Sequence, residues 1–204
     1  MNGVAIYLEG GGEAPQQKAE LRQGMDSFLN TLKEAARIKR LRWKVVCCGG
    51  RNQTHDAFRH AIRTEPDQLN LLLVDSEGPV QGSKIKHLVN RDTWDMTNIQ
   101  EVVVHLMTQC MEAWIVSDVD TLATFYKQNF HRNALPVRQN LEEEPKNDLL
   151  KALEAATRHT QKGNYGKIRH ASKLLALVDP NKAQARCPGC KTLFAWLGNT
   201  LALV

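Results

Sequence analysis

The chain has 204 residues, of which 42% are hydrophobic and 24% charged, a composition typical of a globular protein. Its apolar segments are strand-sized, well short of the roughly 20 residues that a membrane-spanning helix needs. The N-terminus has no basic segment followed by an apolar one, so we expect no signal peptide. Five cysteines, an odd number, favour a reducing compartment over a disulfide framework. We therefore expect a cytoplasmic protein with no membrane contact.

The formal net charge is +5 and the isoelectric point is about 9.0. Much of the positive charge lies in two segments that contain no acidic residue, 37–44 and 158–173. Segments of this kind either bind a polyanion such as nucleic acid or are simply solvated surface. Both interpretations stay open at the level of the sequence.

Strand-like and helix-like patterns alternate over the first two thirds of the chain. Short, nearly continuous apolar runs, which are typical of buried parallel strands, predict strands over 4–8, 43–48, 69–74 and 101–107. Apolar residues at helical spacing predict one helix over 19–40 and another over 54–64. A third helical region begins near residue 111 and continues to 126, with Asp118 or Asp120 as an internal cap. The polar stretch 80–97 is expected to be an irregular crossover loop.

No strand pattern follows residue 128. A loop around Pro136 leads to helices over 148–158 and 168–177, and Pro180 suits the first turn of another. This order of elements predicts an α/β fold with a mainly parallel four-stranded sheet flanked by helices. We assign residues 1–128 to this core and 129–204 to a helical C-terminal extension that packs on it.

Acidic residues gather where the expected strands end. Glu9 and Glu13 flank three glycines, Asp75 and Glu77 follow the third strand, and Glu112 follows the fourth. Because the carboxyl ends of parallel strands lie at one edge of a sheet, acids that are distant in sequence can meet there. Carboxylate oxygens suit a hard cation such as Mg²⁺ or Mn²⁺. Acids at strand ends and helix starts are also common without any ligand.

The motifs Leu8-Glu9-Gly10-Gly11-Gly12-Glu13, Val74-Asp75-Ser76-Glu77 and Met111-Glu112-Ala113-Trp114 occur in this order. In order and spacing they resemble the successive signatures of Toprim domains, most closely the OLD-like and RloB-like branch that accompanies ATPases in bacterial defence systems. The C-terminal segments Pro145-Lys146, Tyr165 with Lys167, Arg186-Cys187-Pro188 and Phe194-Ala195-Trp196-Leu197 resemble the helical end of an uncharacterised Toprim-like family. The resemblance therefore covers nearly the whole chain.

The resemblance implies a metal-dependent subunit that cleaves phosphodiester bonds in DNA or RNA and acts beside an ATPase of the ABC or SMC type in anti-phage defence. It implies Glu9, Glu13, Asp75 and Glu77 as metal ligands and catalytic groups. Glu112 is expected as a further acid, and Lys167 as the lysine that neutralises charge in the transition state. The sequence departs from the family pattern at Glu77, where Asp-x-Asp is usual.

Several alternatives stay open. The chain contains no G-x-x-x-x-G-K-[ST] sequence, so a partner would have to supply any ATP site. A non-catalytic Toprim-like adaptor that binds the ATPase or nucleic acid is the main alternative, and a small-molecule phosphotransfer domain is another. Cys187 and Cys190 have the spacing of half a zinc site, although buried thiols are the simpler interpretation. A homo-oligomer is compatible with the sequence.

Overall fold

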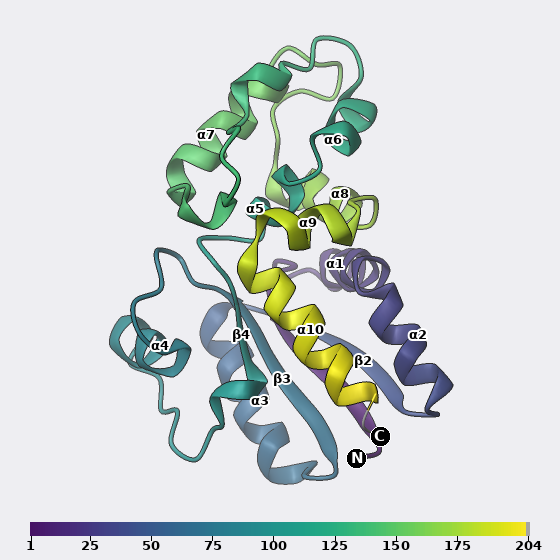
Figure 1. Cartoon of the computed structure of the whole chain (residues 1–204), viewed down its shortest axis with the longest axis vertical. Helices are drawn as coiled ribbons and strands as arrows, with labels where there is room; N and C mark the ends of the chain where they lie inside the picture. The colour runs from purple at the N-terminus through teal and green to yellow at the C-terminus, as the bar shows by residue number, and fades with distance from the viewer. Residues whose placement is uncertain (203–204) are drawn as a thin grey trace.

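A four-stranded, all-parallel sheet lies at the centre of the computed structural model, which describes residues 1–202 (Figure 1). The strands are β1 (Gly3–Glu9), β2 (Arg42–Gly49), β3 (Gln68–Asp75) and β4 (Val104–Met107), in the spatial order β2-β1-β3-β4. The sequence prediction of an α/β fold with a parallel four-stranded sheet is confirmed. All four strands end at the same edge of the sheet, since every pairing between them is parallel.

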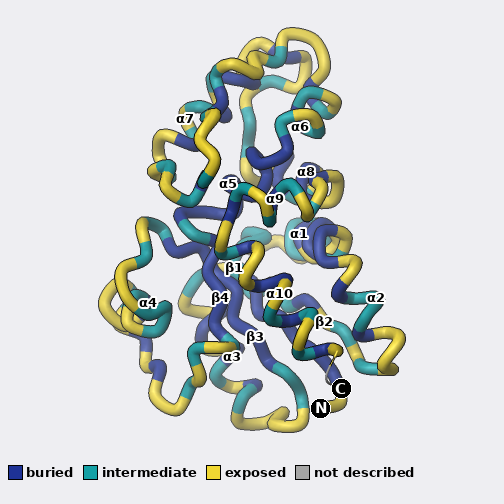
Figure 2. Tube along the Cα trace, in the orientation of Figure 1, coloured by how far each residue is buried: buried dark blue, intermediate teal, exposed yellow. Residues whose placement is uncertain are grey.

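Helices cover both faces of the sheet, and β1 contributes to a hydrophobic cluster on each. Val4, Ile6 and Leu8 pack with α1 (Pro15–Phe28) and α2 (Asn30–Ile38). Ala5 and Tyr7 point the other way and pack with α3 (Arg51–Thr64) and α4 (Lys84–Asp92). The alternation follows from the two-residue period of a strand, and Figure 2 shows the central strands as the most buried part of the chain.

Two predictions about the helices were wrong. The single helix expected over 19–40 is divided at Leu29, whose backbone leaves the helical conformation between α1 and α2. Leu29 is fully buried, so the change of direction is fixed by packing, and no glycine or proline marks it. The stretch 80–97 contains α4, for which the side chain of Ser83 accepts a hydrogen bond from the Lys86 N–H and caps the first turn.

After β4 the chain is helical: α5 (Glu112–Val116), α6 (Val119–Tyr126), α7 (Lys146–Thr157), a π-helical turn Lys167–Ala171, α8 (Ser172–Leu175), α9 (Pro180–Arg186) and α10 (Pro188–Ala202). α8 packs on α1, and α10 packs on α2 and β4 (Figure 1). These helices therefore join the hydrophobic cluster on the α1 face of the sheet. None of the helices within residues 1–202 is long and apolar enough to cross a bilayer.

Asp118 connects α6 to α9. Its carboxylate caps α6 by accepting the Thr121 N–H, and it also accepts the Asp179 N–H at 3.1 Å and Lys182 Nζ at 2.7 Å. Burial would raise the pKa of Asp118, but these hydrogen bonds outweigh it and lower the pKa below its usual value. Ionised Asp118 therefore stabilises the fold above the unfolded-state pKa of about 3.9, and this contribution is lost as the pH falls.

We expect Asp118→Asn to reduce the free energy of unfolding by about 1–2 kcal/mol at pH 7, because asparagine keeps the size of the cap but loses its charge and one of its two acceptor oxygens. The difference from the wild type should shrink as the pH is lowered from 7 to 3. Urea denaturation at several pH values measures it. The exposed Asp148, changed to asparagine, serves as the control, and an equal loss in both variants at every pH would contradict the assignment.

Candidate functional site

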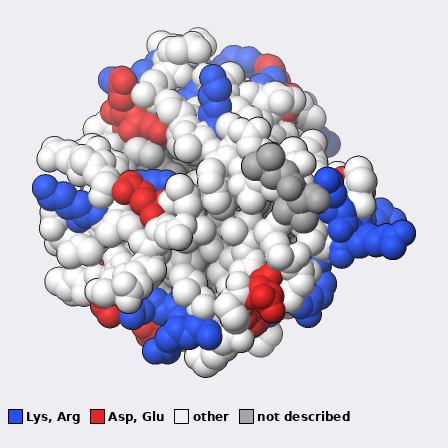
Figure 3. Space-filling model, turned by 60° about the horizontal axis from the view of Figure 1, so that its bottom comes forward, with Lys and Arg blue, Asp and Glu red and all other residues white. Residues whose placement is uncertain are grey.

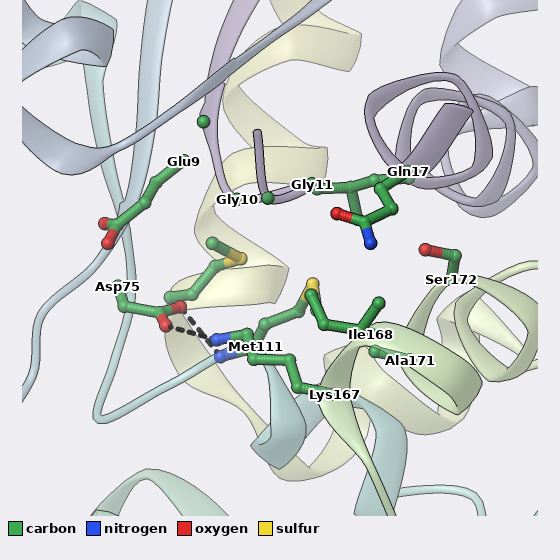
Figure 4. A pocket seen from close by; sticks show the side chains of 14 residues that line it. Glu9, Gly10, Gly11, Gln17, Asp75, Met111, Lys167, Ile168, Ala171 and Ser172 are labelled. Carbon is green, nitrogen blue, oxygen red and sulfur yellow. Dashed lines mark hydrogen bonds and ion pairs between the residues drawn. The ribbon is translucent and has the colours of Figure 1, made fainter. Parts of the chain in front are cut away.

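Two acidic residues from adjacent parallel strands line one cavity at the carboxyl edge of the sheet. Glu9 ends β1 and Asp75 ends β3, and both border a cavity of about 250 Å³ (Figure 4). Lys167 and Ser172 line it from the C-terminal helices, and Gln17 from the start of α1. The sequence prediction that strand ends bring these distant carboxylates together is thus met for Glu9 and Asp75.

The three glycines after Glu9 form the wall of this cavity. Gly10, Gly11 and Gly12 all have positive φ angles, of 113°, 85° and 61°, which side-chain-bearing residues rarely adopt. A Cβ at Gly11 would lie 2.9 Å from the Cα of Lys18. The glycines are therefore needed both for the backbone conformation and for the close approach of the turn to α1.

Asp75 is the most buried acid of the cavity, with 3% of its surface exposed. One carboxylate oxygen accepts the Met111 N–H at 2.9 Å, and the other lies 3.3 Å from Lys167 Nζ. Burial raises the pKa of Asp75 to about 6, despite the opposing effect of Lys167. A single lysine thus compensates only part of the cost of placing this carboxylate in the interior.

Lys167 lies between Asp75 and Glu112. Its ammonium group is 3.8 Å from Glu112 Oε1, which also accepts a hydrogen bond from the Tyr165 hydroxyl at 3.0 Å. Burial would lower the pKa of Lys167, but the two carboxylates outweigh it and raise the pKa above its usual value. Glu112 is 1% exposed, and its Oε2 has no hydrogen-bond partner among the described residues. Lys167 therefore stays protonated, and it lines the cavity beside Asp75.

Arg51, at the start of α3, is a site residue that the sequence prediction missed. It donates to Glu9 Oε2 at 2.8 Å and to the Asp75 carbonyl oxygen at 2.7 Å. The rest of its guanidinium binds both oxygens of Asp92 and lies 4.9 Å from the centre of the Trp94 ring. One feature of the sequence could have indicated Arg51 as a site residue: Gly49-Gly50-Arg51 follows β2 just as the glycine turn follows β1. Its partners Asp92 and Trp94 lie in and after the helix α4, where a loop was expected.

The other two predicted metal ligands lie elsewhere. Glu13 is exposed and does not line the cavity. Glu77 has a positive φ of 63° and forms an ion pair with Lys146 at the start of α7, while Arg91 approaches it at 3.9 Å. The structure therefore brings together Glu9, Asp75, Lys167 and Glu112, but not Glu13 or Glu77. Within residues 1–202, no group of three or more His, Cys, Asp or Glu side chains is arranged to hold a metal ion.

Cys187 and Cys190 are both buried, at the turn between α9 and α10. Burial raises the pKa of each thiol well above its usual value. Over the part of the chain that the structure describes, no third histidine, cysteine or acid joins them in a metal-binding group. Their environment is that of hydrophobic core residues.

Fold and site together define a parallel α/β protein with a paired carboxylate–lysine site at the carboxyl edge of its sheet. The chain belongs to the family DUF4276, a domain of unknown function, which it matches over residues 8–198. This match includes every site residue from Glu9 to Lys167 as well as most of α10. No curated protein and no solved structure matches the chain.

Proposed function

We propose that this protein is a Toprim-type, divalent-metal-dependent nuclease subunit. The observation that carries the proposal is the convergence of Glu9 and Asp75, from adjacent strand ends, on a cavity that also receives Lys167. Acidic groups at this edge of a parallel sheet, next to a glycine turn, suit the metal-assisted binding of a phosphodiester. The resemblance of the strand-end motifs to Toprim domains points to the same chemistry.

The residues present fit Mg²⁺ or Mn²⁺. Mg²⁺ commonly binds through one or two carboxylates, keeps several waters and takes its other ligands from substrate phosphate, so Glu9 and Asp75 would suffice. The raised pKa of Asp75 also favours a cation at this position, because the nearby lysine alone leaves the buried carboxylate undercompensated. When bound, the metal would supply a nucleophilic water at neutral pH and would polarise a phosphoryl oxygen.

The chain's own residues position the substrate and balance charge. Arg51 fixes the carboxylate of Glu9 through a charge-assisted hydrogen bond of 2.8 Å. Lys167, protonated between Asp75 and Glu112, is placed to neutralise negative charge that develops on a phosphoryl group in the cavity. The glycine turn, which packs closely on α1, forms the wall along which the substrate backbone would approach the ends of β1 and β3.

We expect the purified protein to cleave DNA or RNA oligonucleotides with Mg²⁺ or Mn²⁺ and not with EDTA. Glu9→Gln should reduce this cleavage at least 10²-fold, because it removes one of two carboxylates that hold the cation. Glu13→Gln, which makes the same change at an exposed position outside the cavity, is the matched control. Cleavage that persists in EDTA, or that is unaffected by Glu9→Gln, would contradict the metal assignment.

A non-catalytic adaptor that binds an ATPase or nucleic acid is a second candidate. The observation that favours it is the engagement of Glu77 by Lys146 and Arg91, which draws one expected ligand away from Glu9 and Asp75. Absence of cleavage with every divalent metal, both alone and with a partner ATPase, would establish this alternative. The ATPase partner, the role in anti-phage defence and the cytoplasmic location all belong to the proposal and come from the resemblance or the composition.

A further inference from the structure

A second hollow adjoins the acidic cavity. It has a volume of about 570 Å³ and lies between the start of α1, the end of α6 and the helical turn that carries Lys167. Gln17 and Ile168 line both hollows, so these two side chains form the border between them. In Figure 4 Gln17 and Ile168 face the acidic cavity from the side opposite Asp75.

The second hollow is strongly basic. Lys162, Arg169 and Lys173 line it with a single acid, Glu20. All three cations are exposed, and none has a carboxylate within 4.0 Å in the region covering residues 1–202. These three charges also act on His170. Burial is the largest cause that lowers the pKa of His170, and the three cations lower it further. Unneutralised cations in a concave surface attract a polyanion.

The basic hollow also contains an aromatic ring. Phe125, at the end of α6, is partly exposed and lies edge-on against Tyr126 and His170, which fix its orientation. Lys162 Nζ lies 4.8 Å from the centre of its ring. An aromatic ring held in place among exposed cations is the combination that proteins use for single-stranded nucleic acid, whose bases are free to stack.

We infer that this basic hollow binds a single-stranded segment of nucleic acid beside the acidic cavity. Phosphates contact Lys162, Arg169 and Lys173, and one unpaired base stacks on Phe125. The strand then passes Gln17 and Ile168, which places its next phosphodiester at Glu9 and Asp75. The inference rests on the proposed nuclease function for its purpose, because an acidic cavity repels free phosphate and the substrate needs its affinity from neighbouring cations.

The basic segment at the other end of the sheet provides a matched control. Arg37, Lys39 and Lys44 are also exposed, and Arg37 forms an ion pair with Glu34 at 3.4 Å. They lie at the end of α2 and on β2, toward the end of the sheet where β2 begins. Figure 3, seen from the end of the molecule where the termini lie, shows Lys and Arg side chains in separate groups with acids between them. Replacing these three cations changes the net charge by the same amount as replacing Lys162, Arg169 and Lys173, but leaves the basic hollow unchanged.

The test measures binding of a fluorescent 12-nucleotide single strand by anisotropy in EDTA, where no metal-dependent cleavage occurs. We expect the triple variant Lys162→Gln/Arg169→Gln/Lys173→Gln to bind at least 30-fold more weakly than the wild type. The slope of log K against log salt should fall by about 2, since each lost phosphate contact removes about 0.7 for a single strand. Arg37→Gln/Lys39→Gln/Lys44→Gln should bind within about threefold of the wild type. Equal losses in both triple variants, or none in the first, would overturn the inference.

A second variant separates base stacking from charge. Phe125→Leu keeps an apolar side chain of similar bulk, and its fold is checked by circular dichroism. We expect it to weaken binding of the single strand by about 5- to 100-fold while binding of an abasic strand of equal length stays unchanged. Duplex binding as tight as single-strand binding, with no effect of Phe125→Leu, would overturn the single-strand assignment.

These experiments test the binding inference and the nuclease proposal separately. A protein that binds the strand through the basic hollow but cuts it with no divalent metal refutes the nuclease proposal alone. A protein that cuts with Mg²⁺ or Mn²⁺, but whose binding is unchanged by the Lys162, Arg169 and Lys173 substitutions, refutes only the inference that the basic hollow binds the strand.

Discussion

Asp75→Asn is expected to lower metal-dependent cleavage on the order of 10³-fold without lowering the melting temperature. Asparagine matches the shape of Asp75 and can still accept the Met111 N–H through its amide oxygen. Its NH2 group cannot accept from Lys167, which keeps Glu112 as its ion-pair partner. It lacks the negative charge that would hold a cation. It also lacks the cost of a buried carboxylate, which at Asp75 is large enough to raise the pKa to about 6.

Loss of activity with unchanged or raised stability is the pattern expected where a fold maintains an unfavourable group for function. Cleavage rates with Mg²⁺ or Mn²⁺ and thermal unfolding of the same preparation measure the two effects. Asp56→Asn, at an exposed position on α3, is the matched control. If Asp75→Asn cuts as fast as the wild type, Asp75 does not hold the metal; if it unfolds several degrees lower, the role of Asp75 is structural.

The strands were predictable because each contains a short, nearly continuous apolar run. The fourth was predicted too long, since Glu101–Val103 forms a 3-10 turn before β4. Leu69 to Val74 can only be buried, and a parallel strand at the centre of a sheet buries both of its faces. The break at Leu29 and the helix α4 were not predictable to the same degree. Leu29 carries no local signal, since its conformation results from tertiary packing, and α4 is too short and polar for its apolar spacing to stand out.

The residues of the site, like the elements of the fold, were predictable only in part. Convergence of Glu9 and Asp75 follows from topology alone, because both end parallel strands that prove to be neighbours. The position of Lys167 came from a family resemblance, since nothing local to a helical turn near the C-terminus indicates contact with β3. Glu77 was wrongly placed among the residues of the site, because at a positive φ its side chain pairs with Lys146 instead. Backbone conformation of this kind depends on the surrounding loops.

Gly24, within α1, determines how closely α8 packs on α1. A Cβ at this position would lie 2.4 Å from the carbonyl oxygen of Ser172, which begins α8 and lines the acidic cavity. Backbone atoms on both sides leave no flexible side chain to move aside. The absence of a Cβ therefore sets the distance between α1 and α8, and with it the position of Lys167 one turn earlier.

We expect Gly24→Ala to lower the free energy of unfolding by about 1–3 kcal/mol, the usual cost of overpacking, although alanine is favoured over glycine within a helix by up to about 1 kcal/mol. Gly198→Ala in α10 is the matched control, because its Cβ would meet only Leu32 at 3.8 Å; it should stabilise the protein by up to about 1 kcal/mol. Thermal unfolding of the two variants should thus shift in opposite directions. Gly24→Ala should also weaken metal-dependent cleavage, since displacement of α8 moves Lys167 away from Asp75. A Gly24→Ala variant that unfolds above the wild type would show that α8 does not rest on α1 at this distance.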